Sequence, residues 1–168
     1  MNKVFKKYVK ETKSIVNNKE FPKYKTAFNK FKKIIILGNG GSNSIASHIS
    51  QDMAKFYNKV SFSFSDPSML TCFINDFGMS NAYLKFLKIY GDKNSLYILI
   101  SSSGESQNII NCLNYLEKNN MAYGVLTGFK NKNKVKVGAK KSLFNFHVKS
   151  ENYGVVECTH QIFLHGVI

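Results

Sequence analysis

The sequence predicts an α/β protein with a doubly wound, five-stranded parallel sheet and a helical extension at its N-terminus. Short apolar runs alternate with longer segments of helical periodicity, and turns rich in Gly or Ser close two of those runs. Neither an internal repeat nor a linker divides the 168 residues, a length that suits one domain. We therefore divide the chain into an N-terminal helical segment, 1–33, and a single α/β domain, 34–168.

The first 33 residues are predicted to form two helical segments, broken near Phe21-Pro22. A stripe of side chains recurs at intervals of three to four residues, namely Val4, Tyr8, Thr12 and Ile15-Val16. The first residues include lysines but no apolar stretch, so we expect no secretory signal there.

Beyond residue 33, strands and helices are expected to alternate. The run Ile34–Leu37 is apolar throughout, which is typical of a parallel strand buried on both faces. Further strands are expected at 60–64, where apolar and polar residues alternate, at 96–100, which is another buried apolar run, and at 122–126 and 144–148. Helices are expected at 43–57, at 68–90 with a break at 76–78, through 109–116, and from about residue 155 to the end. We expect the three cysteines to fill the core.

The composition argues against nucleic acid and membranes as partners. The formal charge is +14, but all 24 basic residues are Lys and none is Arg, the residue that makes bidentate contacts to bases and phosphates. No apolar run approaches the roughly 20 residues that span a bilayer. Three widely spaced cysteines form neither a disulfide framework nor a metal motif, which suits a reducing cytoplasm.

Two loops that follow strands stand out as ligand sites, because open parallel sheets bind ligands at the carboxyl ends of their strands. The first is Gly38-Asn39-Gly40-Gly41-Ser42, where glycines let the backbone approach a ligand closely. It lacks the spacing of a dinucleotide fingerprint or a P-loop, and a tight turn without a ligand is the alternative.

The second loop is Ser101-Ser102-Ser103-Gly104-Glu105-Ser106. Four hydroxyl groups and several backbone N–H groups would converge on the positive end of the following helix, which makes a phosphate cradle. The alternative is a helix cap in which one serine suffices.

Together these loops resemble the SIS (sugar isomerase) family, which has a flavodoxin-like fold, and within it the phosphoheptose isomerase branch. The resemblance covers roughly residues 30–168. The matching segments are GNGGS at 38–42, NDFG at 75–78, SSSGES at 101–106, LTG at 126–128 and ECTHQIFLH at 157–165.

The resemblance implies a set of site residues. The phosphate loop would be Ser101, Ser102, Ser103 and Ser106, and the sugar would meet Asn39, Gly40, Gly41, Ser42, Asp76 and Glu157. The catalytic pair would be Asp52 and His165. Some relatives also bind Zn²⁺, and the corresponding positions here are His48, Asp52, Glu157 and His165. Members of the family are tetramers whose sites include residues of neighbouring subunits.

Residue spacing supports part of this assignment. His48 and Asp52 are four residues apart and share one face of a helix, while Glu157 and His165 are close to two turns apart. Imidazole and carboxylate groups are suitable Zn²⁺ ligands. Taken singly, His48 would be a surface histidine and His165 a packed one. His147 and His160 are assigned no role.

The chain also departs from the family pattern. Asp52 replaces a Glu and Glu157 replaces a Gln. Phe56 stands where an Arg is usual, and Gly154 stands where an Asp is usual. The sequence stops at Ile168, three residues after His165, whereas relatives continue this helix for several turns. A displacement of about 1 Å at a reacting group can cost about 100-fold in rate.

The expected function is therefore aldose–ketose isomerisation of sedoheptulose 7-phosphate to D-glycero-D-manno-heptose 7-phosphate, for lipopolysaccharide or capsule synthesis. The alternatives are a phosphosugar-binding SIS module without catalysis, and an isomerase or epimerase of another sugar phosphate. The expected partners are the phosphorylated heptose and further copies of the chain in a homotetramer.

Overall fold

The computed structural model describes residues 2–168. Its helices are α1 (Lys3–Val16), α2 (Glu20–Lys30), α3 (Gly41–Tyr57), α4 (Pro67–Phe77), α5 (Met79–Tyr90), α6 (Gln107–Lys118), α7 (Lys134–Gly138) and α8 (Tyr153–His165). Its strands are β1 (Lys33–Leu37), β2 (Val60–Ser63), β3 (Ser95–Ser101), β4 (Tyr123–Thr127) and β5 (Phe144–His147).

The five strands form one parallel sheet in the order β2-β1-β3-β4-β5, which confirms the predicted fold class. After β1 the chain crosses to β2 on one side, and it then returns to place β3 on the other side of β1. The connections that leave β1 and β3 therefore diverge, which opens a crevice at the carboxyl ends of these strands.

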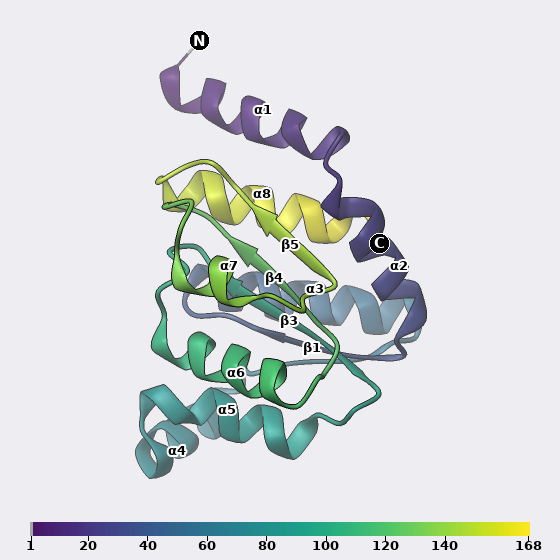
Figure 1. Cartoon of the computed structure of the whole chain (residues 1–168), viewed down its shortest axis with the longest axis vertical. Coiled ribbons are helices and arrows are strands. Elements are labelled where there is room, and N and C mark those ends of the chain that lie inside the picture. Colours follow the sequence, from purple (N-terminus) through teal and green to yellow (C-terminus); the bar gives the residue numbers. More distant parts are fainter. Residues whose placement is uncertain (1) are drawn as a thin grey trace.

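Helices cover both faces of the sheet (Figure 1). On one face, α2, α3 and α8 pack against alternate strand residues such as Ile34, Ile36 and Ile98. On the other face, helices α5 and α6 pack against the strand residues that point the opposite way, such as Ile35, Leu37 and Leu99. Helices α4 and α7 pack at the margins of this second core. The alternation of side chains along each strand accounts for these two separate cores.

The N-terminal helices differ from the prediction at their junction. The break falls at residues 17–19, before Phe21-Pro22, and Pro22 lies in the first turn of α2. A proline fits there because the first N–H groups of a helix have no partner within it. Helix α2 is part of the core, since its Tyr24 stacks on Phe163 and donates a 3.1 Å hydrogen bond to the Leu164 carbonyl. Helix α1 lies outermost, across α8 (Figure 1).

One helix was not predicted from the sequence, and one further expectation needs correction. Helix α7 was not expected, because five residues are too few to display a helical period; the Asn133 side chain caps it by accepting from the Lys136 N–H at 2.9 Å. Only Cys112 is buried, whereas Cys72 and Cys158 are exposed on α4 and α8. Within residues 2–168, no helix has the length and apolar character needed to cross a bilayer.

Acid should destabilise the fold through His160, which lies fully buried in α8. Its Nε2 is 3.0 Å from the Thr127 carbonyl, and burial lowers the pKa of His160 to about 4. The unfolded chain, with an ordinary pKa near 6.5, therefore binds more protons between pH 6.5 and 4. The free energy of unfolding should fall as pH falls through that window.

Urea unfolding at pH 7, 6 and 5 measures this effect, and His160→Gln is the comparison because its side chain does not titrate. We expect a shallower pH dependence in the variant, with a remaining part from His147, whose pKa burial also lowers to about 4. Equal slopes in both proteins would contradict the assignment, whatever the absolute stability of the variant.

Candidate active site

The loops after β1 and β3 lie side by side, and an amide pair joins them. Asn39 Nδ2 donates to Asn108 Oδ1 at 3.0 Å, and Asn108 Nδ2 donates back to Asn39 Oδ1 at 2.8 Å. Asn108 is buried in the first turn of α6. This reciprocal bond fixes the spacing of the two loops, so the crevice between them is preorganised.

The first loop turns sharply into α3 through Gly40, which has a φ of +53°. The Glu157 carboxylate packs directly against the next residue, Gly41, in the space that a Cβ atom on residue 41 would occupy. The glycines therefore bring α8 close to the start of α3. Ser42 is buried at that start.

The second loop depends on Gly104, which has a φ of +67° and packs against the Asn133 side chain where a Cβ atom would clash. The Gly104 N–H donates to Ser101 Oγ at 3.1 Å, and Ser101 Oγ lies 3.2 Å from Ser106 Oγ. Ser102 differs from these, because its hydroxyl is buried and has no hydrogen-bond partner among the described residues. A buried hydroxyl without a partner is costly, which suggests that a ligand completes the site.

A cavity of about 130 Å³ lies between the two loops. Its lining carries hydroxyl, amide and carboxyl groups and includes Asn39, Ser42, Ser101, Ser102, Ser103, Ser106, Tyr153 and Glu157. Ser106 precedes α6 but its side chain caps none of the first-turn N–H groups, so the positive end of α6 remains available to an anion. All four serines predicted for a phosphate loop thus surround one cavity.

Glu157 is the one carboxylate in this lining, and burial raises its pKa. The cause is that the low-dielectric surroundings disfavour the charged form.

A second cluster lies further along α3. Asp52 Oδ2 is 3.2 Å from His165 Nε2 and 3.4 Å from His48 Nε2. One ligand atom from each of the three residues lies within 4.8 Å of the others. The Asp52 side chain is 19% exposed, whereas those of His165 and His48 are 34% and 51% exposed. The cluster is therefore partly open to solvent, so a ligand could reach it.

Two of the expected residues lie elsewhere. Glu157 does not join the cluster of His48, Asp52 and His165, because eight residues separate it from His165 by about 12 Å along the axis of α8. Its carboxylate lies against Gly41 instead. Asp76 is exposed at the end of α4, where it accepts hydrogen bonds from Asn75 and Cys72, and it does not line the cavity.

Several site residues were not expected from the sequence. Tyr153 lines the serine cavity and packs its ring on Phe129 at a centroid distance of 4.6 Å. A second cavity, of about 430 Å³, runs along α3 beside His48 and is lined by Asn43, Ser44, Ser47, Gln51 and Ser65. The only signal for this lining was the i, i+4 spacing of polar residues on one face of α3.

Comparison with known proteins places the chain among phosphoheptose isomerases by sequence. No model of a protein family matches the chain. The phosphoheptose isomerase of Fusobacterium nucleatum is 31% identical over 165 residues, which cover 95% of this chain and 80% of that protein. The phosphoheptose isomerase of Buchnera aphidicola is 33% identical over 133 residues, which cover 76% and 69% of the two chains.

Solved structures agree on the fold. The phosphoheptose isomerase of Neisseria gonorrhoeae aligns with a TM-score of 0.82 at 22% identity, covering 97% of this chain and 92% of that one. That of Francisella tularensis aligns with a TM-score of 0.86 at 19% identity, covering 98% and 92%. The fold is that of a sugar isomerase domain of the SIS type. Within that class, the similarity in sequence shows that the chain belongs to the phosphoheptose isomerase family.

Proposed function

We propose that this protein interconverts sedoheptulose 7-phosphate and D-glycero-D-manno-heptose 7-phosphate, and so supplies heptose for a lipopolysaccharide or a capsule. Membership of the phosphoheptose isomerase family supports the reaction class. The observation that carries the proposal is the presence of two complementary sites along α3. One is the serine cavity with its unpartnered Ser102 hydroxyl, and the other is the His48–Asp52–His165 cluster.

The serine cavity would hold the phosphate group. Hydroxyl groups of Ser101, Ser102, Ser103 and Ser106 would donate to phosphate oxygens, aided by the positive end of α6. The volume of about 130 Å³ is below the 300–1,000 Å³ typical of pockets for whole ligands, so this cavity suits one end of an extended sugar chain. The opposite end would reach toward Asp52.

The reaction moves one proton from C1 to C2 and one hydroxyl proton from O1 to O2. Asp52 would accept the proton from C1 and return it to C2 through an enediolate, while His165 would transfer the hydroxyl proton. The 3.2 Å contact between His165 Nε2 and Asp52 Oδ2 orients the imidazole toward the carboxylate. That contact would hold both groups at the same two carbon atoms.

The same cluster fits Zn²⁺, because two imidazole nitrogens and one carboxylate oxygen lie within 4.8 Å of one another. His48, Asp52 and His165 would hold the ion, with Glu157 remaining at the serine cavity. When bound, it would supply a Lewis acid that polarises the substrate carbonyl.

We further propose a homotetramer with shared sites, located in the cytoplasm. Helix α4 supports this assembly, because none of its residues is fully buried although the sequence is rich in apolar side chains. Phe77 and Met79 near its end are 37% and 48% exposed. A neighbouring subunit that covered α4 would shield them, and Asp76 from one chain could then contact the sugar in the site of another. An odd number of free cysteines suits a reducing compartment.

Glu157→Gln should tighten binding of inorganic phosphate at neutral pH by a few-fold, because it removes a carboxylate from the cavity that takes the anion. The wild-type protein loses that repulsion as pH falls through the raised pKa of Glu157, whereas the variant does not titrate. The difference in affinity between the two should therefore shrink toward pH 5. Isothermal titration at pH 8, 7, 6 and 5 tests this, and a constant difference across the series would contradict it.

Departures from the family pattern near the site bear on two alternative functions. These are a phosphosugar-binding module without catalysis and an enzyme for another sugar phosphate. Phe56, one turn after Asp52 on α3, is 60% exposed and offers no charge to a substrate. Gly154 has a packing explanation, because a Cβ atom there would lie 2.5 Å from the Tyr8 hydroxyl of α1. This change therefore does not by itself indicate a different sugar.

An NMR time course with sedoheptulose 7-phosphate, with and without added Zn²⁺, tests the proposal. Appearance of the aldose 7-phosphate supports the isomerase. Saturable binding without any aldose would favour the binding module. Turnover of another sugar phosphate in the same assay, with none of sedoheptulose 7-phosphate, would favour an enzyme for that other sugar.

A further inference from the structure

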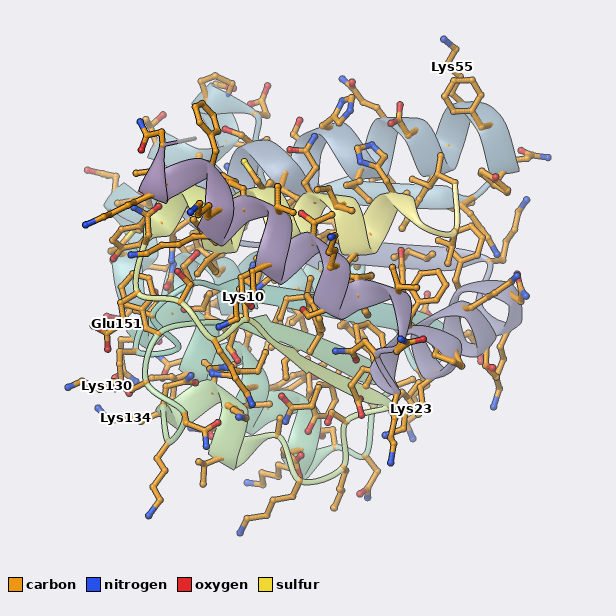
Figure 2. All side chains as sticks on the ribbon, turned by 90° about the horizontal axis from the view of Figure 1, so that it is seen from above. Lys10, Lys23, Lys55, Lys130, Lys134 and Glu151 are labelled. Carbon is orange, nitrogen blue, oxygen red and sulfur yellow. The ribbon has the colours of Figure 1, made fainter. Side chains whose placement is uncertain are left out.

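A separate cavity lies at the carboxyl ends of β4 and β5. It measures about 410 Å³ and is lined by Phe129, Asn131, His147, Lys149, Ser150 and Glu151. Its size is within the range of pockets for small ligands. Figure 2 shows Glu151 at one edge of the molecule, with Lys130 and Lys134 along the same edge and Lys55 at the opposite corner.

Two lysine ammonium groups without an ion-pair partner among the described residues lie at this cavity, beside the Glu151 carboxylate. Lys149 lines it, and Lys136 lies beside it, donating a hydrogen bond to the Asn131 side chain. Within residues 2–168 neither lysine forms an ion pair, whereas Lys134 nearby pairs with Glu105 at 3.1 Å. Burial and the proximity of Lys149 lower the pKa of Lys136. Two ammonium groups thus repel each other at the edge of an open cavity.

His147 contributes a neutral donor to the same cavity. Its Nδ1 lies 3.0 Å from Thr127 Oγ1, and no described residue bonds to its Nε2. If the Thr127 hydroxyl donates to Nδ1, the neutral ring carries its proton on Nε2, which is then available to an acceptor. The ring stays neutral near pH 7 because burial, Lys136 and Lys149 lower its pKa to about 4.

We propose that this cavity binds a small phosphate-bearing anion, held by the Lys149 ammonium and His147 Nε2–H with added attraction from Lys136. A doubly charged phosphate group would offset both lysine charges and accept a hydrogen bond from the imidazole. This site goes beyond the proposed isomerase function, which does not require it.

The site is a neighbour of the serine cavity but is built from different side chains. Phe129 is one of its walls, and the Phe129 ring packs on Tyr153, a wall of the serine cavity. Phe129 also holds a φ of +58°, a backbone conformation that non-glycine residues rarely adopt. The aromatic pair therefore separates two potential anion sites.

Other charges near Lys149 are mixed. Lys149, Ser150 and Glu151 also line a smaller cavity with Lys7, Lys10 and Glu11 of α1. The carboxylates of Glu151 and Glu11 oppose an anion. They are outnumbered by four lysines, because Lys7, Lys10 and Lys149 line the two cavities and Lys136 lies beside the larger one.

The test is a titration of the full chain with inorganic phosphate and with pyrophosphate at constant ionic strength, observed by NMR of the histidine rings. The His147 signal is assigned by its loss in His147→Gln. We expect a saturable shift of the His147 signal, and a weakening of at least about tenfold in Lys149→Gln, since one hydrogen bond to a charged group is removed. Lys55→Gln makes the same charge change at a distant site and should leave the dissociation constant unchanged.

Two results would overturn the proposal. One is a His147 signal that does not shift at phosphate concentrations at which phosphate binds in the serine cavity. The other is equal weakening in Lys149→Gln and Lys55→Gln, which would indicate only general attraction to a chain of charge +14. Neither readout depends on isomerase activity.

Discussion

Replacing Asp52 with Asn is expected to lower the rate of isomerisation about 1,000-fold, the middle to upper range for loss of a general base, while the chain keeps its fold. Asn retains the size of the side chain but cannot accept the C1 proton. The side chain is 19% exposed and bonded to His165, so substitution creates no cavity in the core. Steady-state kinetics measures the loss, and circular dichroism with thermal unfolding verifies the fold.

Asp52→Glu is the matched control, because it keeps the carboxylate and restores the residue usual in the family. We expect it to retain far more activity than Asp52→Asn. His165→Gln, which removes the other proton carrier, should resemble Asp52→Asn. Wild-type rates in Asp52→Asn or His165→Gln would remove these residues from the mechanism.

Replacing Ser102 with Ala is expected to raise the dissociation constant of the sugar phosphate about tenfold to 100-fold without lowering stability. The hydroxyl is buried and unpartnered in the free protein, so its removal breaks no hydrogen bond there. In the complex, however, it would donate to a charged phosphate oxygen, a bond worth about 1.5–3 kcal/mol. Calorimetric binding and thermal unfolding measured on the same preparation separate these two effects.

Two serines provide controls for this prediction. Ser101→Ala should cost stability, because Ser101 Oγ accepts from the Gly104 N–H and contacts Ser106. Ser142→Ala, remote from the cavity, should leave sugar phosphate affinity unchanged. A Ser102→Ala protein that is less stable but binds normally would show that the hydroxyl has a structural role instead.

The fold could be predicted from the sequence because β1 and β3 contain uninterrupted apolar runs, whereas the edge strands β2 and β5 alternate apolar and polar residues. A run such as Ile34–Leu37 can be buried on both faces only between two layers of helices. The helix break at 17–19 could not be placed, because Pro22 is as compatible with the first turn of a helix as with a break. Helix α7 depends on a single Asn133 cap, which carries little information in a sequence.

The arrangement of the candidate site residues was predictable where local sequence determines their geometry. Four serines in one loop before a helix must surround its N-terminus, and His48 and Asp52 must share a helical face. The position of Glu157 was not predictable from spacing alone, because it depends on the contact between α8 and Gly41. The Asn39–Asn108 pair and Tyr153 join segments far apart in the chain, and no local pattern indicates such contacts.

The most direct test of the account is deuterium incorporation from D₂O during conversion of sedoheptulose 7-phosphate, observed by NMR for the wild-type protein and Asp52→Asn. A proton held on a partly exposed carboxylate exchanges with solvent, so the wild-type protein should form aldose 7-phosphate that carries deuterium at C2. Asp52→Asn should form almost none in the same time. Labelled aldose formed equally by both proteins, or saturable binding with no aldose from the wild type, would contradict proton transfer at the His48–Asp52–His165 cluster.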